Sequence, residues 1–236
     1  MSPEIKYLKD KTQLTSLAAD IISARLLENI SNSGQASLMV SGGSTPGPLY
    51  ERLSRVELPW HKVKIGLVDE RWVGEEDAGS NAALIRKTLL QNHGEKARFS
   101  PMVTQHKAAR EGQSRVEAIY RGITRPYSVI VLGMGGDGHT ASWFPDANGL
   151  AKALDMDNKN LVQAMTANPS PTTGAYLERM TLTRSALANC KLALLLITGA
   201  DKQQILAQAL EDKQSPLPIR AALDVLGERL IVLSAP

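Results

Sequence analysis

The run VLGMGGDGHTASWFP, residues 131 to 145, decides the fold class, because a short apolar segment passes here into a glycine-rich turn. Residues 129 to 132 read Val-Ile-Val-Leu, which predicts a buried strand. The glycines that follow allow positive φ angles and a close approach of a ligand to the backbone. Asp137 and His139 then stand at the carboxyl end of the strand, where open parallel α/β sheets bind ligands. We therefore expect an α/β sheet with a proton-transferring pair at its edge.

Residues 133 to 138 also match the G-x-G-x-x-G pattern of dinucleotide-binding folds. That pattern belongs at the first strand-to-helix turn, with an acidic residue about 20 residues further on. Here it lies past the middle of the chain, and the region around Asp155 and Asp157 has the composition of a polar loop. We interpret the match as accidental. Two alternatives stay open: a nucleotide-binding oxidoreductase, and an ordinary tight turn with a surface histidine.

Strand-like and helical patterns alternate along the whole chain, as in a mostly parallel, doubly wound α/β sheet with helices on both faces. Strands are predicted at 36–40, 63–68, 129–132, 161–164, 192–197 and 230–233, with a short one at 180–183. Helices are predicted at 12–30 and near 80–92, 107–121, 183–189 and 201–211. We expect the C-terminal strand to complete the sheet. No internal repeat appears, and we expect one domain over residues 1–236.

Length and composition indicate a protein with a substantial core. The chain has 236 residues, of which 43% are hydrophobic. The helix at 12–30 would bury the apolar stripe Leu14, Leu17, Ala18, Ile21, Ile22, Leu26 and Leu27. The single cysteine, Cys190, cannot form an internal disulfide and is predicted to be buried as a small hydrophobic residue.

Charge and targeting signals narrow the range of partners. The formal net charge is +3, and Lys and Arg are scattered, so no nucleic-acid surface is indicated. Residues 1 to 10 carry charges without an apolar signal segment, and no uninterrupted apolar run approaches about 18 residues. We therefore expect a cytoplasmic protein with no membrane partner and a small anionic ligand.

The run SGGSTPGPLY, residues 41 to 50, follows the first predicted core strand and leads into a helix. Gly42 and Gly43 expose backbone N–H groups, Ser44 adds a hydroxyl donor, and the positive end of the helix favours an anion. Because the Gly-Lys-Ser/Thr ending of a Walker loop is missing, a phosphate ester is a better candidate than a nucleoside triphosphate. An ordinary capped strand-to-helix turn is the alternative.

Charged residues follow other predicted strands in the same way. Asp69 and Arg71 come directly after the strand at 63–68, where a carboxylate can hold hydroxyl groups and a guanidinium can bind phosphate. Arg179 lies beside the short strand at 180–183, and Lys202 lies near the start of the helix at 201–211. Each of these charges also fits an ordinary solvated surface, and the loop at 168–174 fits a flap over a site.

Metal-dependent and serine-hydrolase chemistry are poorly supported. The four histidines, His61, His93, His106 and His139, include no H-E-x-x-H pair, and the first three are predicted to lie in loops or on the surface. There is no G-x-S-x-G elbow around Ser44 or Ser142. We expect no metal, with water as the nucleophile.

Together these motifs resemble the 6-phosphogluconolactonase family. The resemblance rests, in order from about residue 36, on SGGSTP, VDERWV, Ser80-Asn81, GGDGHTASWFP, ERMTLT, ITGADK and PLP. That family is similar in fold to glucosamine-6-phosphate deaminase, whose members typically continue after the histidine into Asn-Glu-Pro. This chain continues into Thr140-Ala141-Ser142 and has no acid there. Trp143 is a departure within the lactonase pattern, where leucine is usual.

The resemblance implies hydrolysis of 6-phospho-D-glucono-1,5-lactone to 6-phosphogluconate in the oxidative pentose phosphate pathway, with no metal and no organic cofactor. His139 would act as general base and Asp137 would orient it, while backbone N–H groups of the glycine-rich turn would stabilise the oxyanion. The phosphate would be held by Gly42, Gly43, Ser44, Arg179 and Lys202, with Arg71 as a further candidate, and Asp69 would contact sugar hydroxyls. We expect a monomer or small homo-oligomer; a deaminase or isomerase and a non-catalytic sugar-phosphate sensor are the alternatives.

Overall fold

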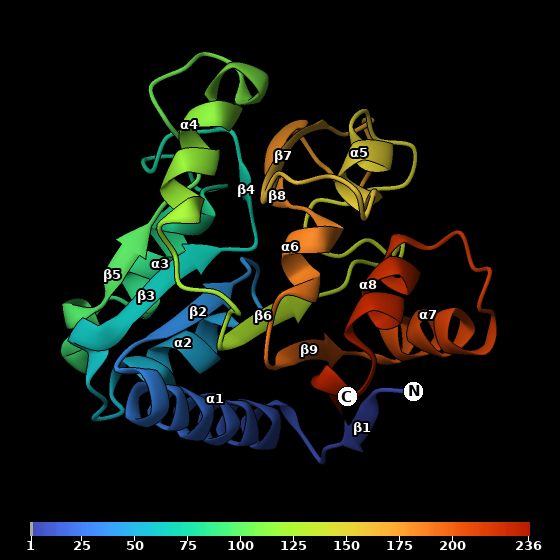
Figure 1. Cartoon of the computed structure of the whole chain (residues 1–236). Coiled ribbons are helices and arrows are strands. Elements are labelled where there is room, and N and C mark those ends of the chain that lie inside the picture. The colour runs from blue at the N-terminus through green and yellow to red at the C-terminus, as the bar shows by residue number, and fades with distance from the viewer. Residues whose placement is uncertain (1) are drawn as a thin grey trace.

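The computed structural model describes residues 2–236 and is built around one parallel sheet of seven strands (Figure 1). The strand order is β1-β10-β9-β6-β2-β3-β5, and every neighbouring pair is parallel. The strands are β1 (Glu4–Tyr7), β2 (Ala36–Val40), β3 (Val63–Leu67), β5 (Arg98–Ser100), β6 (Val129–Gly133), β9 (Ala193–Thr198) and β10 (Leu230–Ala235). The predicted α/β fold class is confirmed.

The central strands are buried along almost their whole length, because helices cover both faces of the sheet. Strands buried on both faces read as continuous apolar runs, which is why β2, β6 and β9 were visible in the sequence. The helices are α1 (Lys11–Ser33), α2 (Gly47–Ser54), α3 (Asn81–Thr88), α4 (Ala109–Arg121), α5 (Leu150–Leu154), α6 (Arg184–Ala188), α7 (Ala200–Glu211) and α8 (Pro218–Leu226). In Figure 1, α1 and α2 lie below the sheet, and α4 and α6 lie above it.

A second, three-stranded antiparallel sheet lies in the upper middle of Figure 1, between α4 and α5. Its strands are β4 (Asp69–Arg71), β8 (Glu178–Leu182) and β7 (Val162–Thr166), in the order β4-β8-β7. The strand predicted at 161–164 therefore lies outside the parallel sheet. Residues 69–71, expected as charges in a loop, form a strand instead, because their backbone pairs with β8 only one residue after β3 ends.

The C-terminal strand joins the large sheet, as expected. The C-terminal strand β10 is not the edge, because β1 pairs with it in register from Glu4 opposite Ile231 to Tyr7 opposite Ser234.

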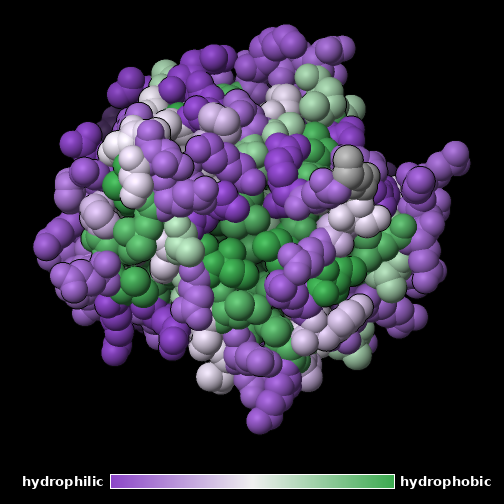
Figure 2. Space-filling model, turned by 60° about the horizontal axis from the view of Figure 1, so that its bottom comes forward, coloured by the Kyte–Doolittle hydropathy of each residue, from purple (hydrophilic) through white to green (hydrophobic). Residues whose placement is uncertain are grey.

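Leu27 of α1 is 43% exposed, although Leu14, Ala18, Ile22 and Leu26 are buried as predicted. Figure 2 brings the bottom of Figure 1 forward and shows a hydrophobic area bordered by hydrophilic residues on that face.

The strand order reverses direction between β2 and β6. From β2 the chain proceeds through β3 to β5 on one side, whereas β6, β9 and β10 follow on the other side. Ligands of open α/β sheets bind at such a switch point, beyond the carboxyl ends of the strands. Within residues 2–236, no helix is both long enough and apolar enough to cross a membrane.

Candidate active site

A cavity of about 470 Å³ lies at this switch point, beyond the carboxyl ends of β2, β6 and β9. Eight of the nine predicted site residues line it: Gly42, Gly43, Ser44, Asp69, Arg71, His139, Arg179 and Lys202. Asp137 is bound to His139 at its rim. The structure therefore brings together residues that are up to 160 positions apart in the chain, as expected when parallel strands end at the same edge.

The turn after β6 orients the imidazole of His139. Asp137 Oδ1 lies 2.5 Å from Nδ1 of His139 and also accepts its backbone N–H at 3.2 Å. With Nδ1 donating to the carboxylate, the neutral ring carries its free electron pair on Nε2, which can accept a proton. Burial raises the pKa of Asp137, but the hydrogen bond and charge of His139 more than offset it, so that pKa lies below its ordinary value. Asp137 is therefore an anion beside the imidazole.

Glycines and an aromatic ring hold this turn in shape. A side chain on Gly135 would lie 2.1 Å from His139 Nδ1, so only glycine fits against the ring. Phe144 packs on the other side, with its ring centroid 4.3 Å from that of the imidazole. The N–H groups of Gly135 and Gly138 donate to His139 O and Gly135 O within the turn. These two N–H groups are therefore not free to stabilise an oxyanion, contrary to our expectation for the turn as a whole.

The loop after β2 forms a polar cradle on the other side of the switch point. Gly43 has a φ of 105°, a conformation that a side chain would strain. Ser41, Gly42 and Ser44 also line the cavity. The Oγ of Ser41 is buried and has no hydrogen-bond partner within residues 2–236. Buried hydroxyl groups are normally satisfied, so this loop is suited to a ligand with acceptor oxygens.

Two arginine residues are direct neighbours on adjacent strands of the second sheet. In the antiparallel pairing of β4 with β8, Arg71 stands directly opposite Arg179. Like charges in this position destabilise a ladder, unless an anion lies between them. Both side chains line the cavity, and so does Lys202 in the first turn of α7. Within the described part of the chain, none of these three cations forms an ion pair with an Asp or Glu.

Arg179 is the most unusual of these cations, because it is only 4% exposed. Burial lowers the pKa of its guanidinium, and the nearby charge of Asp69 acts in the opposite direction. Its Nε donates to Tyr176 O at 2.7 Å, one NH2 group donates to Thr173 O at 3.2 Å, and its charge lies 5.0 Å from the centre of the Phe144 ring. A buried cation without an anionic partner is costly, which points to an anionic ligand.

Asp69 accepts hydrogen bonds from two residues that were not predicted from the sequence as part of the site. Ser142 donates its hydroxyl to Asp69 Oδ2 at 2.5 Å, and its own N–H bonds Thr181 Oγ1. Asn81 donates to Asp69 O at 2.8 Å and lines the cavity. Ser142 lies within the motif GGDGHTASWFP and Asn81 within Ser80-Asn81. The sequence shows that these polar side chains are present, but it does not show that their partner, Asp69, lies on another element.

Glu70 points away from the cavity toward the beginning of α3. It is fully buried, and its carboxylate accepts the backbone N–H groups of Arg71, Asn81 and Ala82. Burial raises the pKa of Glu70 to about 7, while these three donors act in the opposite direction. Glu70 is therefore a link between β4 and α3 rather than a group that meets the ligand.

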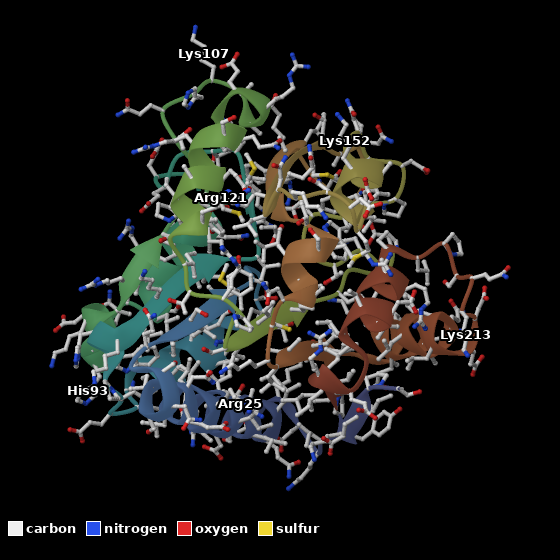
Figure 3. All side chains as sticks on the ribbon, in the orientation of Figure 1. Arg25, His93, Lys107, Arg121, Lys152 and Lys213 are labelled. Carbon is white, nitrogen blue, oxygen red and sulfur yellow. The ribbon has the colours of Figure 1, made fainter. Side chains whose placement is uncertain are left out.

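The remaining predicted features lie elsewhere or only touch the cavity. His61, His93 and His106 are exposed as predicted, and Figure 3 shows His93 at the periphery. Cys190 is buried, and burial raises its pKa to about 11. Trp143 fills the interior, with its indole N–H donating to Leu182 O at 2.9 Å. Among residues 2–236, no three His, Cys, Asp or Glu side chains group as a metal site would require.

The loop at 168–174 contributes one residue, Thr172, to the wall of the cavity. Thr173 is buried and ties the loop together through bonds with Asn168 O and with Ser170. Arg179 donates to Thr173 O, so the loop rests on a cation of the site. Its closure over a ligand stays a prediction.

The family is decided by a match along almost the entire chain. Residues 9–231 match the family described as glucosamine-6-phosphate isomerases/6-phosphogluconolactonase. The chain belongs to this family. A family member from Rhizobium meliloti, named 6-phosphogluconolactonase, is 38% identical over 237 residues and covers 100% of both chains. The resemblance inferred from the motifs is confirmed.

Solved structures of the family have the same architecture. The crystal structure of a 6-phosphogluconolactonase from Shewanella baltica aligns with a TM-score of 0.92 and 36% identity, covering 99% of this chain and 98% of that one. A monomeric glucosamine-6-phosphate deaminase aligns with a TM-score of 0.78 over 98% of this chain and 97% of that one. Because that protein is only 20% identical, it shows the shared fold of the family alone.

Proposed function

We propose that this protein is a 6-phosphogluconolactonase, which hydrolyses 6-phospho-D-glucono-1,5-lactone to 6-phosphogluconate. The observation that carries the proposal is the pair of opposed guanidinium groups, Arg71 and Arg179, in the same cavity as the His139–Asp137 pair. A substrate with a phosphate at one end and a hydrolysable carbonyl at the other needs both features. The names of the closely similar relatives support the same substrate.

His139 would act as the general base in this reaction. Its Nε2 takes a proton from a water molecule, whose oxygen forms a bond to C1 of the lactone. The resulting tetrahedral intermediate collapses as the bond between C1 and the ring oxygen breaks. The imidazolium returns its proton to the ring oxygen, and the new carboxylic acid releases its own proton to water. Asp137, which is bound to Nδ1, stabilises the imidazolium between these two steps.

Other residues of the cavity would bind the two ends of the substrate. The phosphate would accept hydrogen bonds from the Gly42–Gly43–Ser44 loop and charge from Arg179, Lys202 and Arg71. Asp69 would accept from sugar hydroxyl groups, with its carboxylate already fixed by Ser142. None of these steps requires a metal or an organic cofactor.

The reaction can be tested by following the decay of freshly prepared lactone at slightly acidic pH, where spontaneous hydrolysis is slow. Wild-type protein should accelerate the decay, and His139→Ala should lower kcat by about 10² to 10⁴. His106→Ala, which removes an exposed histidine, is the matched control and should keep full activity. A folded His139→Ala variant with wild-type kcat would exclude the general base. No acceleration by wild-type protein would exclude the lactonase, and release of ammonia from glucosamine 6-phosphate would then be measured.

We also propose that the protein acts in the cytoplasm on this small-molecule substrate, as a monomer or small homo-oligomer without nucleic acid. The phosphorylated substrate carries charge and stays in the compartment where it is made. The labelled cations Arg25, Lys107, Arg121, Lys152 and Lys213 lie in different parts of Figure 3, so these five do not form one basic stripe that would follow a nucleic acid.

A further inference from the structure

A buried network behind the charged wall of the cavity fixes the start of α3. One oxygen of Glu70, Oε1, accepts the N–H groups of Arg71 at 2.8 Å and Asn81 at 2.7 Å. The other, Oε2, accepts the N–H of Ala82 at 2.7 Å. A fully buried carboxylate with three backbone donors has one orientation open to it. Glu70 therefore sets where the first residue of α3 lies relative to β4.

That first residue, Asn81, uses its side chain to join three parts of the site. Its Nδ2 donates to Asp69 O at 2.8 Å, and its Oδ1 accepts from NH1 of Arg71 at 3.0 Å. NH1 also donates to Gly79 O at 2.6 Å. Asn81 is 3% exposed and lines the cavity. With NH1 held by two acceptors, the guanidinium has a fixed plane, and its other nitrogens remain for a ligand.

The third part is the cradle after β2. A methyl group placed on Gly42 would lie 1.8 Å from Oδ1 of Asn81 and 2.3 Å from its Cγ. The amide thus occupies the space that a side chain at position 42 would take. Gly42 is not a positive-φ residue, so glycine is needed here for space and not for backbone conformation.

We propose that Asn81, anchored by Glu70, is a positioning residue for the anion site: its amide holds the Arg71 guanidinium toward the cavity and supports the Gly42 turn. The assignment rests on the proposed function in one respect, namely that the bound anion is the phosphate of the substrate. Within residues 2–236, the hydrogen bonds of the Asn81 side chain go to Arg71 and Asp69, and none goes to the His139 turn. Its loss should therefore weaken binding and leave proton transfer intact, which separates KM from kcat.

The primary test is Asn81→Ala. We expect KM for the lactone and Kd for 6-phosphogluconate to rise about tenfold, with kcat within about twofold, because the hydrogen bond to the charged Arg71 is lost. Asn29→Ala is the matched control: Asn29 is also 3% exposed, and its side chain bonds Arg25 O and Lys191 far from the cavity. The control should lose stability without a change in KM. Unchanged KM and Kd in folded Asn81→Ala would overturn the proposal.

A double-mutant cycle tests whether Asn81 acts through Arg71. If it does, the Arg71→Ala/Asn81→Ala protein should bind 6-phosphogluconate no more weakly than Arg71→Ala alone. Independent, multiplying losses of affinity would contradict a positioning role. Failure of the proposed function is distinguishable, because wild-type protein would then not accelerate the decay of the lactone, whatever the variants do.

The contact with Gly42 gives a second test, and its first variant, Gly42→Ala alone, does not depend on how well Asn81→Ala folds. Gly42→Ala should displace the Asn81 amide and raise KM with little change in kcat. In the Asn81→Ala background the atoms that the new methyl group would meet are gone, so Gly42→Ala should then cost less than it does alone. An equal cost in both backgrounds would show that position 42 acts without Asn81.

Discussion

Neutral side chains fix the charged groups of the cavity one by one. Ser142 holds a carboxylate oxygen of Asp69 at 2.5 Å, and Asn81 holds NH1 of Arg71 at 3.0 Å. Hydrogen bonds to charged groups contribute about 1.5–3 kcal/mol, more than bonds between neutral groups. The ligand-binding atoms are thus oriented before the ligand arrives, which lowers the entropic cost of binding.

Removal of the Ser142 hydroxyl should show how much the orientation of Asp69 matters. Asp69 is only 7% exposed in the wild-type protein, and in Ser142→Ala its carboxylate loses the hydrogen bond from the Ser142 hydroxyl. We expect the free energy of unfolding to fall by about 1–3 kcal/mol and kcat/KM to fall about tenfold. Denaturant titration and initial rates measure the two effects.

Ser185→Ala is the control for this substitution, because the Ser185 hydroxyl donates to Asn158 O at 2.7 Å and is absent from the lining of the cavity. It should leave kcat/KM unchanged. A Ser142→Ala enzyme that is as active as wild type would mean that Asp69 keeps its orientation without the hydroxyl.

Residues that interact locally could be predicted from the sequence, and residues with distant partners could not. Asp137 and His139 are two positions apart, so their contact follows from one turn. Ser142 and Asp69 are 73 positions apart, and their contact depends on how β4 is placed beside the turn. Arg179 and Lys202 were singled out by their places next to predicted elements, but their assignment to the phosphate came from the resemblance to a family, because no local pattern reveals their convergence with Gly42.

At the scale of secondary structure, the ladder between β4 and β8 places Arg71 opposite Arg179 and keeps a repulsive pair in the ligand-free protein. This repulsion lowers the stability of the ligand-free protein but provides two positive charges for binding an anion, as is common in functional sites. The cost is greatest for Arg179, which is buried.

Arg179→Met should therefore keep the ligand-free stability within about 1 kcal/mol of wild type or raise it, because a buried charge is replaced by an apolar group of similar length. Binding of 6-phosphogluconate should weaken about 100-fold or more, since a buried charge-assisted contact is lost. Denaturation with and without the product tests both statements.

Arg184→Met is the matched control for Arg179→Met. Arg184 lies 3.9 Å from Asp224 and donates to Ala221 O, at a distance from the cavity lining. This variant should keep its affinity for the product. A strongly destabilised Arg179→Met protein would show that its bonds to Thr173 O and Tyr176 O outweigh the repulsion from Arg71.

Long, buried elements were predictable, and short or exposed ones were not. The pattern at 36–40 predicted β2 with the same bounds, and the amphipathic pattern at 12–30 found α1. The strands β1, β4 and β5 have three or four residues with mixed polarity, too few to show a period. Their formation depends on a partner strand that is already in place. The helices α5 and α8 were also missed.

At the scale of the whole molecule, both sheets contribute to one cavity, which favours the single domain expected over residues 1–236. Unfolding should then be one cooperative transition, with equal calorimetric and van't Hoff enthalpies. The indole of Trp143 donates to Leu182 O in β8 of the small sheet. The indole of Trp60, just before β3 of the large sheet, donates to Val56 O. Tryptophan fluorescence therefore reports on the unfolding of both sheets. Two separated transitions would divide the chain into two domains.

The product should stabilise this single transition. At a concentration of about 100 times Kd, 6-phosphogluconate should add about 2.7 kcal/mol to the free energy of unfolding. For a chain of this length that corresponds to a rise in Tm of about 5–10 °C. Glucose without a phosphate is the control ligand and should leave Tm unchanged, because it offers nothing to Arg71, Arg179 and Lys202. An equal shift with glucose would contradict the anion site.

Because β1 pairs with β10, the large sheet can be completed only at the end of synthesis. Residues 4–7 leave the ribosome early, but among the described residues 2–236 their only partner in the sheet is the strand at residues 230–235. At about 5–20 residues per second, β1 waits roughly 10 to 45 s for β10 to be made. Once β9 has been made, it has no neighbour on that side until β10 follows, and Lys202 lies at this open edge. The cavity reaches its final form only when the last strand of the sheet joins the first.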